Sequence, residues 1–197
     1  FAVDNVVSDR ESGFSFWHVA AADLTVRRLA RDQEITGGQT AIAANWDGAS
    51  QLTAVAGLSF RDKGPYRSSD AYLATVDLSQ PLLPGLKGGF LFGLAGDLLG
   101  LADSGGTVLS IGSVFNCFDC LLKDKQVRRP VLGLTYLDLE EYAGQDSTYA
   151  KGALIASAGQ EPAVAKGSPA EKAGLKAGDI ILAVNNSELS RQNGLSR

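Results

Sequence analysis

The chain has 197 residues with 18 basic and 22 acidic side chains, and its net charge of −4 argues against a partner that is nucleic acid or an anionic membrane. Apolar residues make up 45% and charged residues 20%, which is typical of a globular protein with one large or two small domains. No apolar run reaches the roughly 20 residues of a transmembrane segment, because Asp97 interrupts the best candidate.

The first 112 residues are dominated by strand patterns. The polar turn "SDRESG" precedes the strand formers of "GFSFWHVAA", and three short apolar segments follow between residues 39 and 79, separated by turn signals. The run "GGFLFGLAGDLLGLA" predicts a hairpin with strands at 90–94 and 98–102, and "TVLSIGS" predicts another strand. Closely spaced strands with glycine-containing turns favour a β-barrel or a β-sandwich.

A helical pattern follows in "SVFNCFDCLLKD", where apolar residues recur at three-to-four spacing and Ser113 is placed as the N-cap. Cys117 and Cys120 form a C-x-x-C pair on this predicted helix. We interpret them as small packed side chains, because a zinc site needs about four ligands and the only histidine, His18, is far away in sequence. With no P-loop and no dinucleotide fingerprint either, the sequence predicts no cofactor and no metal.

The remaining residues mix strands with a short helix. The basic, proline-ended "KQVRRP" predicts a domain boundary within residues 125–130, and strands are expected in "VLGLTYL" and "GALIASA". In "GSPAEKAGLKAGDIILAVNN", Ser168 and Pro169 predict the N-cap and first residue of a helix that Gly174 ends. A Gly-Asp turn then leads into the strand "IILAVN".

This last stretch resembles the core of a PDZ domain of the type found in bacterial HtrA/Deg proteases, and "RRPVLGL" resembles that family's carboxylate-binding loop. The resemblance implies a peptide-binding site at Leu132, Gly133, Leu134 and Thr135. Backbone N–H groups of the Leu-Gly-Leu triplet would receive the terminal carboxylate of a peptide, and the following strand would pair with that peptide by β-augmentation. The helix that forms the other wall of the groove would begin near Gln192.

The preceding residues resemble the protease domain of the same family. "YLATVDLSQPLLPGLKGGFLFGLAGDLLGLA" is similar to the segment that carries the nucleophile in a Pro-Gly-Asn-Ser-Gly-Gly-Pro-Leu motif, but Lys87 stands in place of the serine and Leu86 in place of the asparagine. "VVSDRESGFSFWHV" resembles the end of the first barrel, where Gly13 matches the catalytic aspartate. His18 does not match the catalytic histidine, whose region would lie before Phe1.

The resemblance implies a mainly β chain: a trypsin-like (chymotrypsin-fold) Greek-key β-barrel, partial in its N-terminal half, followed by a truncated α/β PDZ domain. We expect a remnant of the first barrel at residues 1–25, the second barrel with a linker helix at 26–124, and a C-terminally incomplete PDZ domain at 125–197. The chain contains no methionine, so we expect a processed product or a fragment.

The substitutions predict a catalytically inactive relative. The Lys87 amine is protonated near neutral pH unless it is strongly desolvated, and an acyl-lysine would be an amide about as stable as the bond broken. We expect the glycine frame to remain as a vestigial oxyanion turn, with the backbone N–H groups of Gly85 and Lys87 as its donors. Leu86 is expected at the mouth of the former cleft.

Three functions stay open at this point. The first is a pseudoprotease that acts as a scaffold or regulatory subunit and recognises C-terminal or exposed peptide tails. The second is an active HtrA-type endopeptidase or chaperone-protease whose catalytic residues are relocated or lie outside this chain. The third is a purely structural subunit of an envelope assembly. The resemblance also implies an extracytoplasmic location, in the bacterial periplasm or cell envelope, and homo- or hetero-oligomers with HtrA-like protomers.

Overall fold

A computed structural model describes most of the chain and confirms that it is mainly β. The chain divides into two compact units. The first unit comprises Phe1–Phe60 and Leu73–Arg129, and the second comprises Arg61–Tyr72 and Pro130–Arg197. The described residues are 2–22, 24–60, 66–71, 73–116, 118–142, 151–189 and 195.

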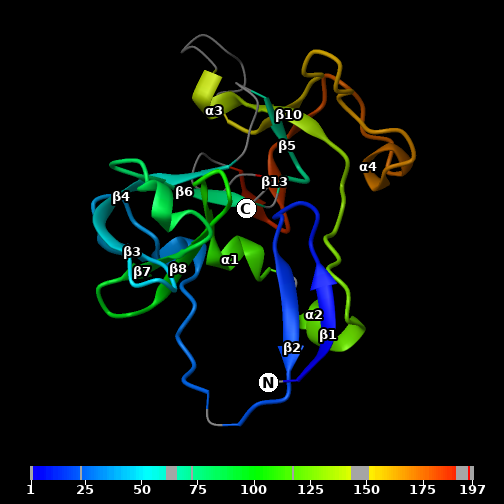
Figure 1. The fold of residues 1–197 in the computed structure, drawn as a ribbon. Coiled ribbons are helices and arrows are strands. Elements are labelled where there is room, and N and C mark those ends of the chain that lie inside the picture. Colours follow the sequence, from blue (N-terminus) through cyan, green and yellow to red (C-terminus); the bar gives the residue numbers. More distant parts are fainter. Residues whose placement is uncertain are drawn as a thin grey trace. The chain divides into compact units, whose positions relative to one another are not determined.

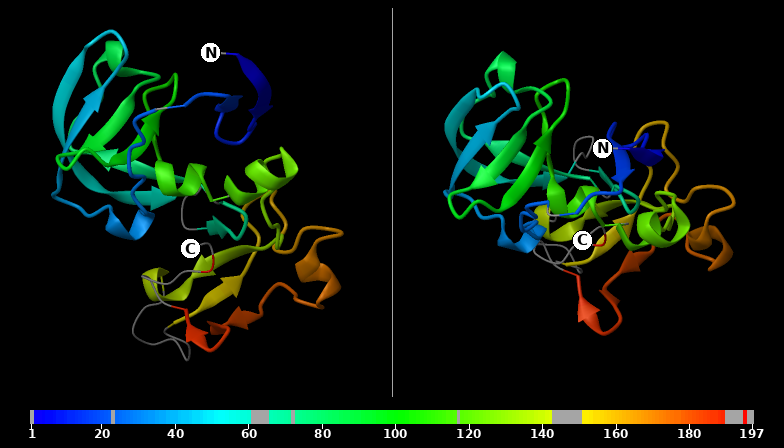
Figure 2. Two further views of the ribbon diagram at one scale, coloured as in Figure 1. Left: turned by 90° about the horizontal axis from the view of Figure 1, so that it is seen from below. Right: turned by 60° about the horizontal axis from the view of Figure 1, so that its bottom comes forward.

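Six antiparallel strands of the first unit close into a barrel in the order β3-β4-β6-β9-β8-β7 (Figure 1). Figure 2 shows these strands, in cyan to green, from two further sides. The hairpin predicted around Ala95-Gly96-Asp97 is confirmed by β7 and β8, and barrel closure leaves these strands without a free edge. The strand bounds are β3 Thr40–Ala44, β4 Ser50–Phe60, β6 Ala74–Leu78, β7 Phe90–Gly93, β8 Leu98–Ala102 and β9 Val108–Ser110.

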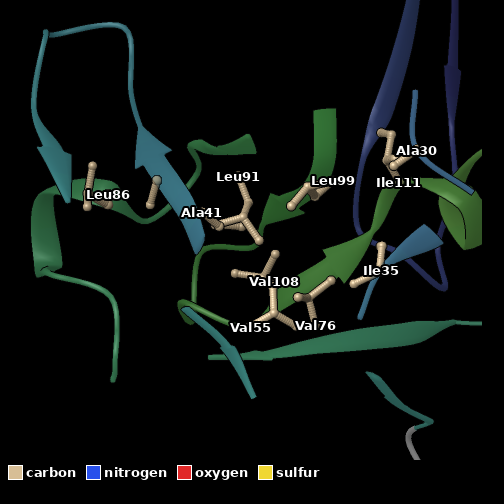
Figure 3. Close-up of a cluster of buried hydrophobic side chains, with 12 residues drawn as sticks. Ala30, Ile35, Ala41, Val55, Val76, Leu86, Leu91, Leu99, Val108 and Ile111 are labelled. Carbon is tan, nitrogen blue, oxygen red and sulfur yellow. The ribbon is translucent and has the colours of Figure 1, made fainter. Parts of the chain in front are cut away.

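The barrel is filled by small and branched apolar side chains. Alternate residues of its strands point inward, so that Ala41 and Ala43 of β3 are both buried. The cluster also takes residues from outside the strands, among them Leu86 and Ile111 (Figure 3). Its members are Ala30, Ile35, Ala41, Ala43, Val55, Val76, Leu86, Leu91, Leu99, Ala102, Val108 and Ile111.

A two-stranded hairpin, β1 (Val3–Ser8) and β2 (Ser15–Val19), precedes the barrel strands in the same unit (Figure 1). Phe14 and Phe16 pack against a buried cluster of Leu73, Leu109 and Val114. In the hairpin turn, both carboxylate oxygens of Asp9 accept hydrogen bonds from the Arg129 guanidinium, at 2.8 and 2.6 Å. Arg129 ends the first unit, so this pair ties the hairpin to the last residue of that unit.

The helix predicted over residues 113–124 forms as two short helices, α1 (Ile111–Val114) and α2 (Phe118–Asp124). The expectation that Ser113 is an N-cap is wrong, because Ser113 lies inside α1 and is fully buried. Its hydroxyl donates to the Ser110 carbonyl at 3.0 Å and accepts from the backbone N–H of Ala74 at 3.1 Å. Cys117 lies outside the described residues. A 3-10 turn, η1 (Asp32–Glu34), precedes β3.

The second unit is built on a four-stranded sheet in the order β12-β11-β10-β5. Ser168 caps α4 as predicted, because its side chain accepts a hydrogen bond from the backbone N–H of Glu171 at 3.1 Å, and Pro169 is the first helical residue. The predicted groove helix near Gln192 begins outside the described residues. The elements are β5 Tyr66–Ser68, β10 Thr135–Asp138, α3 Leu139–Tyr142, β11 Ala153–Ile155, α4 Pro169–Lys172, β12 Ile180–Ile181, β13 Ala183–Val184 and β14 Ser187–Glu188.

The strand β5 differs from the sequence-based expectation. It comes from the connection between the barrel strands β4 and β6, and the prediction assigned all of residues 26–124 to the barrel and its linker helix. In the structure β5 is an edge strand beside β10, so the segment Arg61–Tyr72 groups with the second unit. The physical reason is that β10 has a second edge with backbone donors and acceptors that need partners.

Candidate functional site

The turn predicted to hold a degenerate nucleophile is the 3-10 turn η2 (Pro84–Leu86). The N–H of Leu86 donates to the Leu83 carbonyl at 2.9 Å, and the N–H of Lys87 donates to the Pro84 carbonyl at 3.4 Å. The structure therefore places Gly85 and Lys87 in one turn. Because one of the two expected oxyanion donors already has an acceptor within the turn, it is not directed at a substrate.

Leu86 was expected at the mouth of a former cleft, and this expectation is wrong. Its side chain is only 1% exposed and belongs to the barrel core, together with Leu91 and Val55 (Figure 3). The 3-10 turn carries residue 86 inward, so an apolar side chain at this position fills the core. A polar residue there would lose its hydration without gaining a hydrogen-bonding partner.

Lys87 is exposed, and its aliphatic stem lies over Gly106, where an added Cβ would be 3.5 Å from the lysine Cε. The ion pairs that the structure shows for the described residues do not include Lys87. Its charge therefore faces solvent, as expected for a surface lysine. No hydroxyl nucleophile occupies this position of the turn, because the residue itself is lysine.

The glycine frame around Lys87 has a packing role in the barrel. A Cβ at Gly89 would lie 2.5 Å from the Ala44 carbonyl oxygen, so the backbone of the turn approaches β3 more closely than any side chain permits. Next to β3, the side-chain amide of Asn45 donates to the Gly85 carbonyl at 2.6 Å. These contacts explain how the frame persists without a serine at its centre.

Gly13 lies in the turn between β1 and β2, where its N–H donates to the Asp9 carbonyl at 2.9 Å. A Cβ at this position would have no non-neighbouring atom within 4 Å, so the structure does not bring residue 13 against the Lys87 turn. His18 lies on β2 with its Nδ1 atom 2.5 Å from a carboxylate oxygen of Asp4, and both side chains are exposed. The hydrogen bond from His18 lowers the pKa of Asp4.

The second candidate site is the carboxylate loop, which we define as residues 132–134, with the strand β10 that follows it. Gly133 has a φ of +80°, and a Cβ there would lie 2.4 Å from the Ser168 Cβ atom. The loop is also fixed by backbone bonds: the N–H groups of Ala165 and Ala170 donate to the carbonyls of Gly133 and Leu132, at 2.9 and 3.1 Å. Its own N–H groups have other acceptors.

Those N–H groups converge on Ser69 and Asp70. The N–H of Leu132 donates to Asp70 Oδ1 at 2.8 Å, and the N–H of Gly133 reaches both Asp70 oxygens at 3.1 Å. The N–H of Leu134 donates to Ser69 Oγ at 2.9 Å, while the Ser69 N–H donates to the Leu134 carbonyl at 2.8 Å. The sequence pattern did not reveal either residue, because Ser68-Ser69-Asp70 forms one of the turn signals between residues 39 and 79.

The fourth predicted peptide-binding residue, Thr135, pairs with Ser68 of β5. The register continues with Tyr136 opposite Arg67 and Leu137 opposite Tyr66. The structure therefore brings all four predicted peptide-binding residues together, and each one contacts the segment that we call the internal segment (residues 66–70). An Arg67–Asp138 ion pair at 3.8 Å, with both side chains largely buried, also joins β5 to the last residue of β10.

The comparisons with known proteins cover nearly the whole chain. The PDZ domain family matches residues 162–193, which include α4 and the strands after it. A probable periplasmic serine endoprotease DegP-like of Hahella chejuensis is 28% identical over 200 residues, and its counterpart in a Marinomonas species is 30% identical over 204 residues. These alignments cover 95% and 96% of this chain, and 41% and 42% of the relatives.

The chain is homologous to the HtrA/DegP serine proteases and carries a PDZ domain. It spans about two fifths of the length of these curated relatives. The solved structure of the HtrA-type protease AlgW with a decapeptide superimposes with a TM-score of 0.56 at 22% identity, over 98% of this chain and 63% of that one. AlgW with a tripeptide gives 0.54 at 19% identity, over 93% and 67%. These likenesses show the shared fold, a trypsin-like barrel with a PDZ domain.

Two further properties concern the described part of this HtrA/DegP homologue. Within it, no helix combines the length and apolar character that crossing a membrane requires. The described residues also contain no group of three or more histidine, cysteine, aspartate or glutamate side chains arranged to hold a metal ion.

Proposed function

We propose that this HtrA/DegP homologue is a pseudoprotease: it binds peptides through their terminal carboxylate and does not hydrolyse them. One contrast carries the proposal. The nucleophile position of the family holds the exposed Lys87, whereas the backbone donors of the carboxylate loop converge on a carboxylate. Catalysis is lost because the reacting side chain has been replaced. Recognition is kept because it depends on backbone groups of the carboxylate loop, which a substitution at residue 87 does not change.

The chemistry of Lys87 supports the loss of hydrolysis. A lysine ammonium group has no electron pair for attack on a carbonyl carbon. If the free amine did attack a peptide bond, the acyl group would be held on Lys87 as a new amide. Hydrolysis of that amide would be as slow as hydrolysis of the original peptide bond. A serine protease avoids this problem because its acyl intermediate is an ester, and because a histidine transfers the proton.

The carboxylate loop supports peptide recognition. Hydrogen bonds from N–H groups to a carboxylate are charge-assisted and roughly twice as strong as neutral ones. The loop presents such donors at Leu132 and Gly133, next to the apolar cluster of Leu134, Ile155, Ala163 and Ala170. A peptide with a free carboxylate and an apolar last residue would match both features, with its backbone paired along β10.

We further propose that the protein acts outside the cytoplasm, in the periplasm or cell envelope, as a scaffold or regulatory subunit with HtrA-like protomers. The relatives named as periplasmic endoproteases support this location. Native mass spectrometry of the purified protein, alone and mixed with the Marinomonas relative, tests the assembly. A homo-oligomer or a mixed oligomer supports the proposal. A monomer in both samples that still binds peptides contradicts the subunit role.

The test of inactivity compares the protein with its Lys87→Ala variant and with the Marinomonas relative, which is named as a probable serine endoprotease. Each is incubated with unfolded casein and with a fluorophosphonate probe that labels activated serines. We expect casein cleavage and labelling only for the relative. Casein cleavage by the native protein, or labelling of it, above the level of a protein-free sample would contradict the proposal. Equal activity of the native protein and Lys87→Ala would support an active endopeptidase with relocated catalytic residues, and activity lost in Lys87→Ala would assign the reaction to Lys87 itself.

A further inference from the structure

We infer that residues 66–70 are an internal ligand of the carboxylate loop, so that the peptide site is occupied by the protein's own chain. The nature of the external ligand, a peptide with a terminal carboxylate, rests on the proposed function. The occupancy itself rests on three independent features of the second unit: the Asp70 carboxylate, the direction of β5 and the burial of the contacts between them.

The first feature is the Asp70 carboxylate, which lies where the terminal carboxylate of a peptide would be received. It accepts three hydrogen bonds from the loop, one from Leu132 at 2.8 Å and two from Gly133 at 3.1 Å. The Ser69 hydroxyl orients it by donating to Asp70 Oδ1 at 2.9 Å. The backbone N–H of Asp70 is in turn bound to the Ser68 hydroxyl at 3.2 Å, which fixes the turn before the carboxylate.

The second feature is the direction of the chain. β5 runs antiparallel to β10, and its carboxyl-terminal end leads into the carboxylate loop. A peptide that places its terminal carboxylate in the loop must run in the same direction. The other edge of β10 is taken by β11, so β5 fills the edge that a peptide strand would need. An incoming peptide therefore meets a β10 whose backbone groups are already paired.

The third feature is burial. Ser69 is 4% exposed, and the Arg67–Asp138 pair at the other end of β5 has side chains only 16% and 8% exposed. Buried polar side chains persist in a fold only when their partners are present. Here every partner of Ser69 and Asp70 named above lies in the second unit. The internal segment is therefore held by buried polar contacts of the kind that hold a bound ligand.

Occupancy in the same chain has a quantitative consequence. A tethered ligand acts at an effective concentration of the order of millimolar, so an external peptide must displace it. If the loop is open in about a tenth of the molecules or fewer, the apparent Kd for the peptide is at least about tenfold weaker than the intrinsic one. Weakening the internal ligand should therefore tighten the binding of an external peptide without changing the loop.

The experiment compares the native protein with the variants Asp70→Asn and Asp70→Ala. Asp179→Asn serves as the matched control, because Asp179 is an exposed aspartate of the same unit that accepts a backbone hydrogen bond from Lys176 outside the site. The first readout is hydrogen–deuterium exchange at the amides of Leu132 and Gly133, with circular dichroism as the check on folding. The second is binding of fluorescein-labelled Tyr-Arg-Ser-Ser-Val with a free carboxylate, measured by fluorescence anisotropy.

We expect faster exchange of both loop amides and at least tenfold tighter peptide binding in the Asp70 variants, with no change in Asp179→Asn. Unchanged exchange in a folded Asp70 variant would overturn the inference. Equal peptide affinity for all chains would also overturn it, while leaving the proposed function intact. Exchange that depends on Asp70, without peptide binding to any chain, supports the internal ligand and contradicts the proposed function.

The native protein also provides a test that needs no variant. Protection of the Gly133 amide should stay constant when the protein is diluted 100-fold, because the occupant belongs to the same chain. Loss of protection on dilution would show that the internal segment of a second copy fills the loop, and would overturn the inference. Titration of the labelled peptide into the native protein should shift the Gly133 amide resonance in proportion to the bound fraction.

Discussion

Both carboxylate oxygens of Asp70 accept a hydrogen bond from the backbone N–H of Gly133, each at 3.1 Å. A bifurcated contact of this kind places the N–H on the axis of the carboxylate, and Leu132 adds a second donor at 2.8 Å. The proposed peptide-binding site therefore consists of backbone groups. Its integrity depends on the conformation of the loop, and only indirectly on side-chain identity.

Gly133→Ala should disrupt the carboxylate loop. A Cβ there would lie 2.4 Å from the Ser168 Cβ atom, and the left-handed φ adds roughly 1–2 kcal/mol on its own. Gly167→Ala is the matched control, since its φ of +78° is nearly the same and its Cβ would meet nothing within 4 Å. Urea denaturation should show that Gly133→Ala is destabilised by at least about 2 kcal/mol more than Gly167→Ala, as expected for overpacking. Equal losses would contradict the close approach.

Arg129→Met should destabilise the first unit, because it leaves the Asp9 carboxylate buried without its cation. Removing one partner of a buried pair costs about 3–5 kcal/mol, whereas an exposed pair is worth about 0–1 kcal/mol. Arg128→Met is therefore the control: Arg128 lies 3.6 Å from Asp124, and both side chains are exposed. Thermal denaturation should separate the two variants clearly, and a similar melting temperature for both would contradict the buried pair.

Acid should remove the contribution of the same pair. The hydrogen bonds from Arg129 hold the pKa of Asp9 at about 2 in the folded protein, below its usual value of 3.8. A lowered folded pKa stabilises the fold above the unfolded pKa, and the stabilisation disappears as pH falls through the folded one. The free energy of unfolding should therefore lose about 2 kcal/mol between roughly pH 5 and pH 2. The Asp9→Asn variant should not show this loss of unfolding free energy at low pH. If its acid profile matched that of the native protein, the assignment of the loss to Asp9 would be contradicted.

Leu86→Asn, which restores the residue type of the family motif, should destabilise the barrel. The change removes a side chain that is 1% exposed from the core and buries an amide without a partner, for a combined loss of about 3–5 kcal/mol. Leu83→Asn is the control, because Leu83 is 57% exposed and precedes the same turn. Urea denaturation should show a change within about 0.5 kcal/mol for Leu83→Asn. Equal effects would place residue 86 outside the core.

Local signals predicted much of this fold. The hairpin over Ala95-Gly96-Asp97 and the cap at Ser168 follow from turn and capping chemistry that operates within a few residues, and both appear in the structure. The inward direction of Leu86 could not be predicted, because it depends on the 3-10 turn η2, which the local sequence pattern did not indicate. The pairing of β5 with β10 joins residues about 70 positions apart, and no local pattern encodes such a partner.

The candidate site was likewise predicted only in part. The triplet Leu132, Gly133 and Leu134 was recognisable because the loop has a local sequence pattern. Its occupant was not, because Ser69 and Asp70 act through their position in space and resemble an ordinary turn in sequence. The one available signal was the charge of Asp70. An aspartate after two serines, in a connection between strands, readily accepts hydrogen bonds from backbone N–H groups.

The most direct test of peptide recognition compares one peptide in two chemical forms. Tyr-Arg-Ser-Ser-Val is titrated into the native protein with a free terminal carboxylate or with a terminal amide, and the Gly133 amide resonance reports binding. Valine carries no second carboxylate, so the two forms differ in a single group. We predict at least about tenfold tighter binding of the free acid, in line with the strength of charge-assisted hydrogen bonds. Equal affinity of acid and amide would contradict a carboxylate-binding loop.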